Sequence, residues 1–196
     1  MIPRSKIDKH DQKYTSIHRY ISLLRGINVS GKNMITMPEL VALYEAIGFT
    51  NVVSYIQTGN VIFESPNFDT ATLEKQIEKA IADQFDLGVP VIIRTKEAFQ
   101  QLANRNPFLG QPNIAIKNLY VTFLSAPPSK DTIEVLQGMT FENEAWEMSG
   151  LEIFAQYSTG YGTAKFNNNF IEKKLGVQAT TRNWKSVISL HHILGE

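Results

Sequence analysis

The chain has 196 residues, 43% of them hydrophobic, which is enough for one large or two small domains with a buried core. Its 19 basic residues equal its 19 acidic residues, which excludes a global field that would collect nucleic acid or hold the protein at a membrane surface. The lack of cysteine excludes disulfides and thiolate metal sites and fits a cytoplasmic location. Any anion site must therefore be local.

The first half of the chain is expected to alternate strands and helices. Residues 1–19 are polar without a hydrophobic middle, so we expect a flexible leader and not a secretory signal. A short apolar strand covers 20–24, and a helix begins after Thr36, which forms a capping box with Glu39. Residues 52–57 and 61–64 predict a hairpin. A helix around 73–81, a strand over 90–93 and a helix over 96–103 follow.

The second half repeats this order of elements. Residues 106–117 are rich in Gly, Pro and Asn and are expected to connect the halves. The pattern then predicts a strand over 119–124, a helix over 132–137, a hairpin formed by 141–147 and 151–157, a helix over 166–175 and a strand over 177–180. A terminal helix is expected to bury one face, which carries Trp184, Val187, Ile188 and His191.

The fold class follows from this order of elements. Strand, helix, strand, strand, helix, strand is the ferredoxin-like arrangement, and it occurs twice. We therefore predict an α+β protein with two tandem ferredoxin-like (βαββαβ) lobes and a C-terminal helix. The predicted domains are a flexible leader (1–19), a first lobe (20–105), a connection (106–117) and a second lobe with the terminal helix (118–196).

This topology brings two loops of the first lobe together. In a ferredoxin-like lobe the turn between strands two and three lies at the edge where strand one ends. The nearby start of the first helix adds unpaired N–H groups and the positive end of its dipole, which favour an anion. Arg94 should lie at the opposite edge. The residues expected to converge are Arg25, Asn28, Lys32, Asn33, Gln57, Gly59 and Asn60.

The first of these loops has the spacing of a phosphate-binding loop. Residues 26–33 match G-x-x-x-x-G-K, but Asn33 stands where a Ser or Thr hydroxyl would bind magnesium. The helix also starts several residues later than in such loops, and a hairpin follows it. A nucleotide-hydrolysing loop, a solvated glycine-rich turn and an unconventional anion cradle remain open, and we favour the last.

Two segments of the second half carry weaker signals. Gly160, Tyr161 and Gly162 precede Lys165 between a strand and a helix, where backbone amides can hold an anion. A plain turn is an equal alternative, since the third glycine of the dinucleotide fingerprint is missing. Further on, Trp184 is interpreted as core and Arg182 as an exposed charge, with a ligand role for Arg182 as the alternative.

No residue pattern identifies a reaction. The four histidines lack metal-ligand spacing, so no metal is assigned, and there is no nucleophile elbow or catalytic trio. The carboxylates of Glu39, Glu45, Glu64 and Glu152 are interpreted as caps and solvated faces. The cofactor is unknown, no catalytic residue is assigned, and the sequence leaves open whether the protein is an enzyme.

Five segments, taken together in this order and spacing, resemble a known bacterial family. They are LLRGINVSGKN, YIQTGNVIF, NPF, GYGTAK and TTRNWKSV, and the likeness runs from about Tyr20 to the C-terminus. The family is the one catalogued as domain of unknown function 1697. The resemblance implies two related ferredoxin-like lobes and no activity, because the family is uncharacterised.

The resemblance also implies which residues matter. It singles out the seven residues expected to converge, together with Gly26, Lys165, Arg182 and Asn183. Family members often carry Gly at Ser30 and Ser at Thr58, which are mild departures. They also carry Ser at Ala164, and the missing hydroxyl weakens the case for a ligand contact at that loop.

The leading hypothesis is a small anionic ligand, phosphorylated or nucleotide-like, bound at the edge of the first lobe and in the cleft between the lobes. Arg25 and Lys32 would supply charge. The alternatives are a single-stranded nucleic-acid module, in which Phe63 and Phe123 stack on bases, and a scaffold for a protein partner. A membrane partner is not expected, and the sequence leaves the oligomeric state open.

Overall fold

The computed structural model describes residues 16–29 and 31–196, which form an α+β fold with two four-stranded antiparallel sheets and six α-helices. Most of the predicted leader, residues 1–15, lies outside the described residues, as does Ser30. The first strand already begins at His18, inside the predicted leader. No helix of the described ranges is long and apolar enough to cross a membrane.

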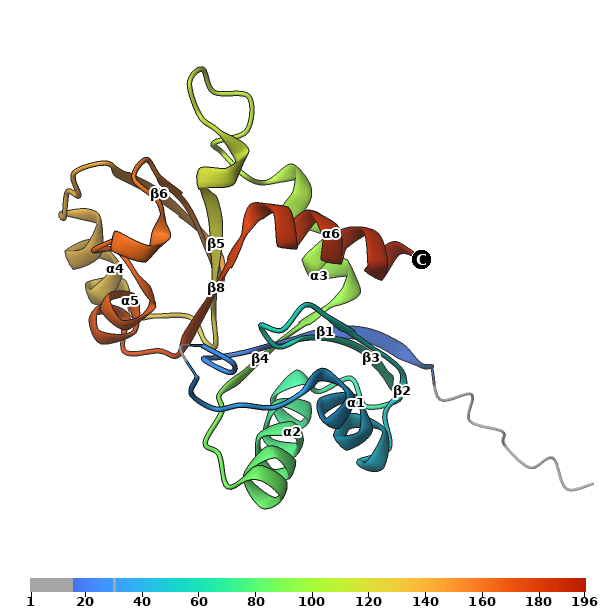
Figure 1. Ribbon diagram of the computed structural model, residues 1–196. Helices are drawn as coiled ribbons and strands as arrows, with labels where there is room; N and C mark the ends of the chain where they lie inside the picture. Colours follow the sequence, from blue (N-terminus) through green and yellow to red (C-terminus); the bar gives the residue numbers. More distant parts are fainter. Residues whose placement is uncertain (1–15, 30) are drawn as a thin grey trace, which may run out of the picture.

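The first half of the chain forms the first sheet, with strand order β2-β3-β1-β4, and two helices (Figure 1). All neighbouring strands in this sheet are antiparallel. The predicted elements are all present, with boundaries shifted by a few residues. In chain order they are β1 His18–Leu24, α1 Met37–Ala46, β2 Thr50–Tyr55, β3 Asn60–Ser65, α2 Thr70–Phe85 and β4 Val91–Thr95.

The second half forms the second sheet, with strand order β6-β7-β5-β8. Before it, α3 Lys96–Gln100 and two 3-10 turns, Gln101–Asn104 and Ile116–Asn118, lead across from the first half. The remaining elements are β5 Leu119–Leu124, α4 Lys130–Gln137, β6 Glu144–Ser149, β7 Glu152–Tyr157, α5 Asn168–Leu175, β8 Ala179–Asn183 and α6 Trp184–Gly195.

Helix α1 begins where its capping residues predict. The Thr36 hydroxyl accepts a hydrogen bond from the Glu39 backbone N–H, and the Glu39 carboxylate accepts one from the Thr36 N–H at 3.1 Å. Hydrogen bonding from Thr36 lowers the pKa of Glu39. The interpretation of Glu39 as a cap is therefore confirmed.

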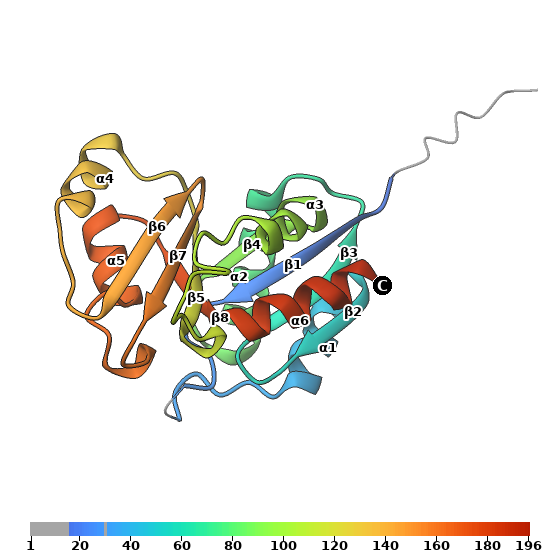
Figure 2. The same ribbon diagram turned by 90° about the horizontal axis from the view of Figure 1, so that it is seen from above.

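Side chains separate into three apolar layers because successive residues of a strand point to opposite faces. Phe63 on β3 points to the layer beneath α1 and α2, whereas its neighbour Ile62 points to a central layer shared with α3, α6 and the second sheet. Helices α4 and α5 cover the outer face of the second sheet. Figures 1 and 2 show α6 lying between the two sheets, beside β1.

Two sequence interpretations are wrong because of this layering. Phe63 and Phe123 are fully buried in the first and central layers, so neither can stack on a nucleic-acid base. The buried face of α6 includes Trp184 and Val187 as predicted, but Leu190 and Leu194 complete it, and His191 is only half-buried.

Candidate functional site

The end of β1 and the tip of the β2–β3 hairpin lie side by side, as the topology predicts. The Leu24 N–H donates to the Gly59 carbonyl at 2.8 Å. The Asn28 side chain donates to the Gln57 carbonyl at 2.9 Å. These bonds fix the glycine-rich loop after β1 against the hairpin, far away in sequence.

Two asparagines hold the shape of this loop from within. Asn28 and Asn33 both have positive φ, which asparagine tolerates better than most residues. The Asn28 amide accepts from the Ile35 N–H and donates to the Ile35 carbonyl, and the Asn33 amide donates to the Gly26 carbonyl at 3.1 Å. The Asn28 amide is therefore fully used in building the loop, and one N–H of the Asn33 amide supports it.

The hairpin tip needs glycine because the backbones approach closely. Gly59 has a φ of +74°, and a Cβ there would lie 2.7 Å from the Leu24 Cβ and 2.8 Å from the Ile27 Cδ1. The next residue, Asn60, is fully buried and donates to the Tyr55 carbonyl and the Thr58 hydroxyl. Gly59 and Asn60 thus support the site from beneath.

Arg182 is buried, with only 7% of its surface exposed, so its interpretation as an exposed charge is wrong. It lies on β8, which extends to Asn183 and not to Thr180 as predicted, and it crosses to the first half. All its hydrogen bonds go to neutral oxygens, namely Asn60 Oδ1 (2.5 Å), Leu24 O (2.8 Å), Thr58 O (3.1 Å), Gly59 O (3.4 Å), Thr180 Oγ1 (2.7 Å) and Thr181 O (3.0 Å).

This environment is unfavourable for the positive charge of Arg182. Burial lowers the pKa of its guanidinium to about 10. Tyr161 raises this pKa and the charge of Arg25 lowers it, both by less than burial does. No carboxylate of the described residues forms an ion pair with Arg182, so its charge is left uncompensated.

Arg25 crosses between the halves in the opposite direction. Its guanidinium donates to both oxygens of Glu172 on α5, at 3.2 and 3.1 Å, and to the Asn169 side chain at 2.7 Å. About a quarter of each partner in this ion pair is exposed. Arg25 therefore closes the space between the glycine-rich loop and the start of α5.

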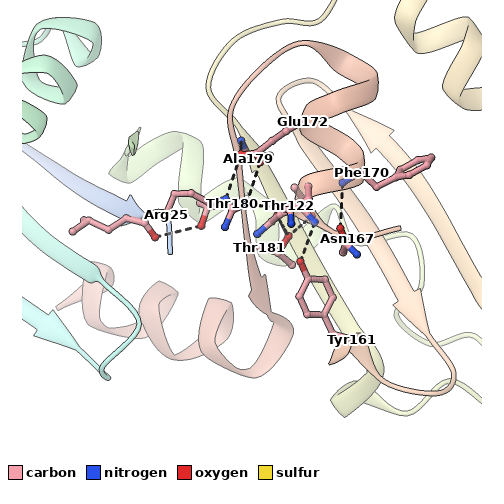
Figure 3. Close-up of polar contacts among 12 residues, drawn as sticks. Arg25, Thr122, Tyr161, Asn167, Phe170, Glu172, Ala179, Thr180 and Thr181 are labelled. Atoms are coloured by element: carbon pink, nitrogen blue, oxygen red, sulfur yellow. Dashed lines mark hydrogen bonds and ion pairs between the residues drawn. The ribbon is translucent and has the colours of Figure 1, made fainter. Parts of the chain in front are cut away.

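A cavity of about 300 Å³ lies at this junction. Figure 3 shows Arg25 on the first-half side of the junction and Thr180, Thr181, Asn167 and Tyr161 on the second-half side. The lining combines guanidinium, amide and hydroxyl groups with a few apolar side chains. The lining residues are Leu24, Arg25, Gly26, Ile27, Val29, Thr58, Tyr161, Asn167, Asn168, Asn169, Thr180, Thr181 and Arg182.

Tyr161 is a lining residue that the sequence reasoning did not select. Its hydroxyl accepts from the Asn168 N–H at 3.2 Å, and its ring stacks on Tyr120 with centroids 5.1 Å apart. Its place between Gly160 and Gly162, in a motif for which an anion loop and a plain turn were equal alternatives, was the signal that could have found it.

The predicted site residues differ in where the structure places them. Arg25, Gly26 and Arg182 line the cavity, while Asn28, Asn33, Gly59 and Asn60 build the walls behind it. Lys32 is exposed beside a second cavity of about 390 Å³, which Arg25, Gly26, Val29, Asn33 and Asn169 also line. Gln57 is exposed and contributes its backbone carbonyl.

The other two predicted residues do not line this cavity. Lys165 is exposed, and its backbone N–H donates to Glu144 at 2.7 Å. Asn183 caps α6, since its side chain accepts from the Ser186 N–H at 2.8 Å. The cap explains the place of Asn183 in its sequence motif, whereas Lys165 contributes its backbone N–H.

The cavity lining is rich in cationic and amide side chains and holds no acidic one. None of its lining residues is a histidine or a carboxylate, so the lining supplies no conventional general base. Within the described ranges, no three His, Cys, Asp or Glu residues cluster as metal ligands would. What the lining offers an occupant is positive charge and hydrogen-bond donors.

Comparisons with known proteins agree with the fold and leave the activity open. A search of curated proteins gave no match. Among solved structures, the chain is similar to the conserved bacterial protein SP0830 from Streptococcus pneumoniae, with a TM-score of 0.73 and 23% identity over 92% of this chain and 100% of that one. The model of the family described as "Protein of unknown function (DUF1697)" matches residues 17–154, and the chain belongs to this family.

Proposed function

We propose that the protein binds a small anionic ligand in the cavity between its halves. The observation that carries the proposal is the buried Arg182 guanidinium, whose partners among the described residues are all neutral. A buried charge without a counter-charge is costly, and an anion in the adjacent cavity would offset that cost. The ligand is therefore expected to be phosphorylated or otherwise acidic.

Arg182 and Arg25 would act on the ligand in different ways. The five N–H groups of Arg182 are all occupied, so its contribution is the electrostatic field of a fixed charge in a poorly solvated place. The Nε and Nη2 atoms of Arg25 donate to side chains of α5, and its Nη1 forms no hydrogen bond within the described part of the chain. Arg25 is thus placed to donate directly to an anion.

The proposed site lies between two lobes of one kind. We interpret residues 20–105 and 118–196 as tandem ferredoxin-like lobes produced by duplication, because both have the element order βαββαβ and both place the first strand inside the sheet. The absence of cysteine supports a cytoplasmic location in a bacterium. A ligand bound between the lobes would contact both.

A thermal-shift panel of phosphorylated metabolites tests this function. A ligand present at one hundred times its Kd stabilises the folded protein by about 2.7 kcal/mol. Arg25→Ala should abolish the ligand-dependent shift. Lys165→Ala, which removes the same charge from an exposed position outside the cavity lining, should leave the shift unchanged. The proposal fails if no panel member stabilises the wild type, or if Arg25→Ala keeps the full shift.

A further inference from the structure

Each half of the chain extends one arginine side chain into the other half, and the two arginines make similar contacts. Arg94 on β4 reaches into the second half, where its Nη2 donates to the Leu124 carbonyl at 2.7 Å and to the Leu151 carbonyl at 3.3 Å. Leu124 ends β5, and Leu151 lies at the tip of the β6–β7 hairpin. Arg94 thereby ties the end of one strand and one hairpin tip of the second half to the first.

Arg182 makes the corresponding contacts in the reverse direction. Its Nη2 donates to the Leu24 carbonyl at the end of β1 and to the Gly59 carbonyl at the β2–β3 hairpin tip, at 2.8 and 3.4 Å. In both arginines Nη1 also donates to the carbonyl of the preceding residue, at 3.0 Å. The two arginines can therefore be compared atom by atom.

The first difference is the acceptor of Nε. Arg94 donates to a carboxylate oxygen of Glu152 at 2.8 Å, in a buried ion pair. Arg182 donates instead to the neutral amide oxygen of Asn60. Glu152 directly follows Leu151, and Asn60 directly follows Gly59. Leu151 and Gly59 are equivalent because the carbonyl of each accepts from Nη2 of the arginine.

The second difference lies on the neighbouring helix. In the first half, Glu74 on α2 accepts from the N–H of Ile93, the residue before Arg94, at 2.8 Å. In the second half, Asn168 on α5 accepts from the hydroxyl of Thr181, the residue before Arg182, at 2.6 Å. An amide thus again replaces a carboxylate near the arginine, and Asn168 lines the cavity.

We infer that Asn60 and Asn168 make the cavity selective for anions, because they keep carboxylates out of the positions that correspond to those of Glu152 and Glu74 near Arg94. The ligand would supply Arg182 with the acidic group, a phosphate or a carboxylate, that the protein itself supplies to Arg94. This inference rests on the proposed function and adds the residues that determine ligand charge. Asn168 would meet the ligand, and Asn60 would act through Arg182.

Asn168→Asp is the sharpest test, because it restores one missing carboxylate at the cavity wall. The substitution keeps an acceptor for the Thr181 hydroxyl, and an acidic residue in the first turn of α5 is favourable for the helix. Asn104→Asp adds the same charge at an exposed position and is the matched control. Asn168→Ala removes the amide without adding charge.

Inorganic phosphate, titrated at constant ionic strength with chloride as the replaced anion, is the probe for calorimetry. We expect Asn168→Asp to weaken phosphate binding at least about tenfold relative to the wild type and to Asn168→Ala. Asn104→Asp should bind as the wild type does. Urea unfolding of each variant checks that the protein remains folded.

Equal phosphate affinity in Asn168→Asp and the wild type would overturn the inference and leave the proposed function standing. An equal loss in Asn168→Ala would also overturn it, since the amide and not the charge would then matter. If the wild type binds no phosphate, the inference is overturned. The proposed function is contradicted as well only if no member of the metabolite panel stabilises the wild type.

Discussion

The Arg94 and Arg182 contacts have nearly the same geometry and differ in charge. Around Arg94, the Glu152 carboxylate completes an ion pair. Burial raises the pKa of the nearby Glu74, and the charge of Arg94 opposes this shift. Around Arg182, the corresponding side chains are the amides of Asn60 and Asn168. The difference teaches that one backbone arrangement can hold an arginine in a buried ion pair in one half and surround it with neutral acceptors in the other.

The largest expected effect separates the two arginines by stability. Arg94→Met leaves the Glu152 carboxylate buried without its main partner and should cost about 3–5 kcal/mol of the free energy of unfolding. Arg182→Met leaves only neutral acceptors behind and should cost about 1–3 kcal/mol. Equilibrium urea unfolding measures both, and equal losses would contradict the contrast.

The two hairpin tips offer a second, smaller contrast. Gly59→Ala must accommodate both a positive φ and a Cβ within 3 Å of Leu24 and Ile27, which we expect to cost about 3 kcal/mol. Gly150→Ala at the other tip also has a positive φ, but its Cβ would meet nothing closer than 3.7 Å, so about 1 kcal/mol is expected. Thermal unfolding of the two variants in parallel tests the difference, and a Gly150→Ala variant that is as unstable as Gly59→Ala would refute it.

The smallest stability effect is expected at Arg25. Ser125 is the corresponding residue after β5. The Arg25 N–H donates to the carbonyl of Pro90, directly before β4, and the Ser125 N–H donates to the carbonyl of Gln178, directly before β8. Arg25→Ser removes a partly exposed ion pair and should cost less than about 1 kcal/mol. Urea unfolding checks this value, and a loss above about 2 kcal/mol would show that the pair with Glu172 is chiefly structural.

Local sequence signals predicted the parts of the fold that local chemistry determines. The Thr36 capping box marks the start of α1, and the hairpin around Gly59 was recognised from its turn residues. Because topology relates strand ends to hairpin tips, the meeting of the Arg25 loop with Gln57 was also predicted correctly.

The errors concern residues whose surroundings come from the other half of the chain. Arg182 and Glu152 were interpreted as solvated charges, yet both are buried by elements distant in sequence. Nothing local distinguishes a buried arginine from an exposed one when its acceptors are carbonyls such as those of Leu24 and Gly59. If the last strand had been predicted to run to Asn183, the alternation of side chains along it would have placed Arg182 on the same face as Thr180, which is buried.

The six oxygen acceptors that hold Arg182 also bear on how fast a ligand could enter. A side chain fixed in this way does not reorient on binding, so the attraction exists before encounter and little ordering entropy is lost later. Association should then accelerate at low ionic strength and slow as the Debye length shrinks from about 30 Å at 0.01 M salt to about 10 Å at 0.1 M.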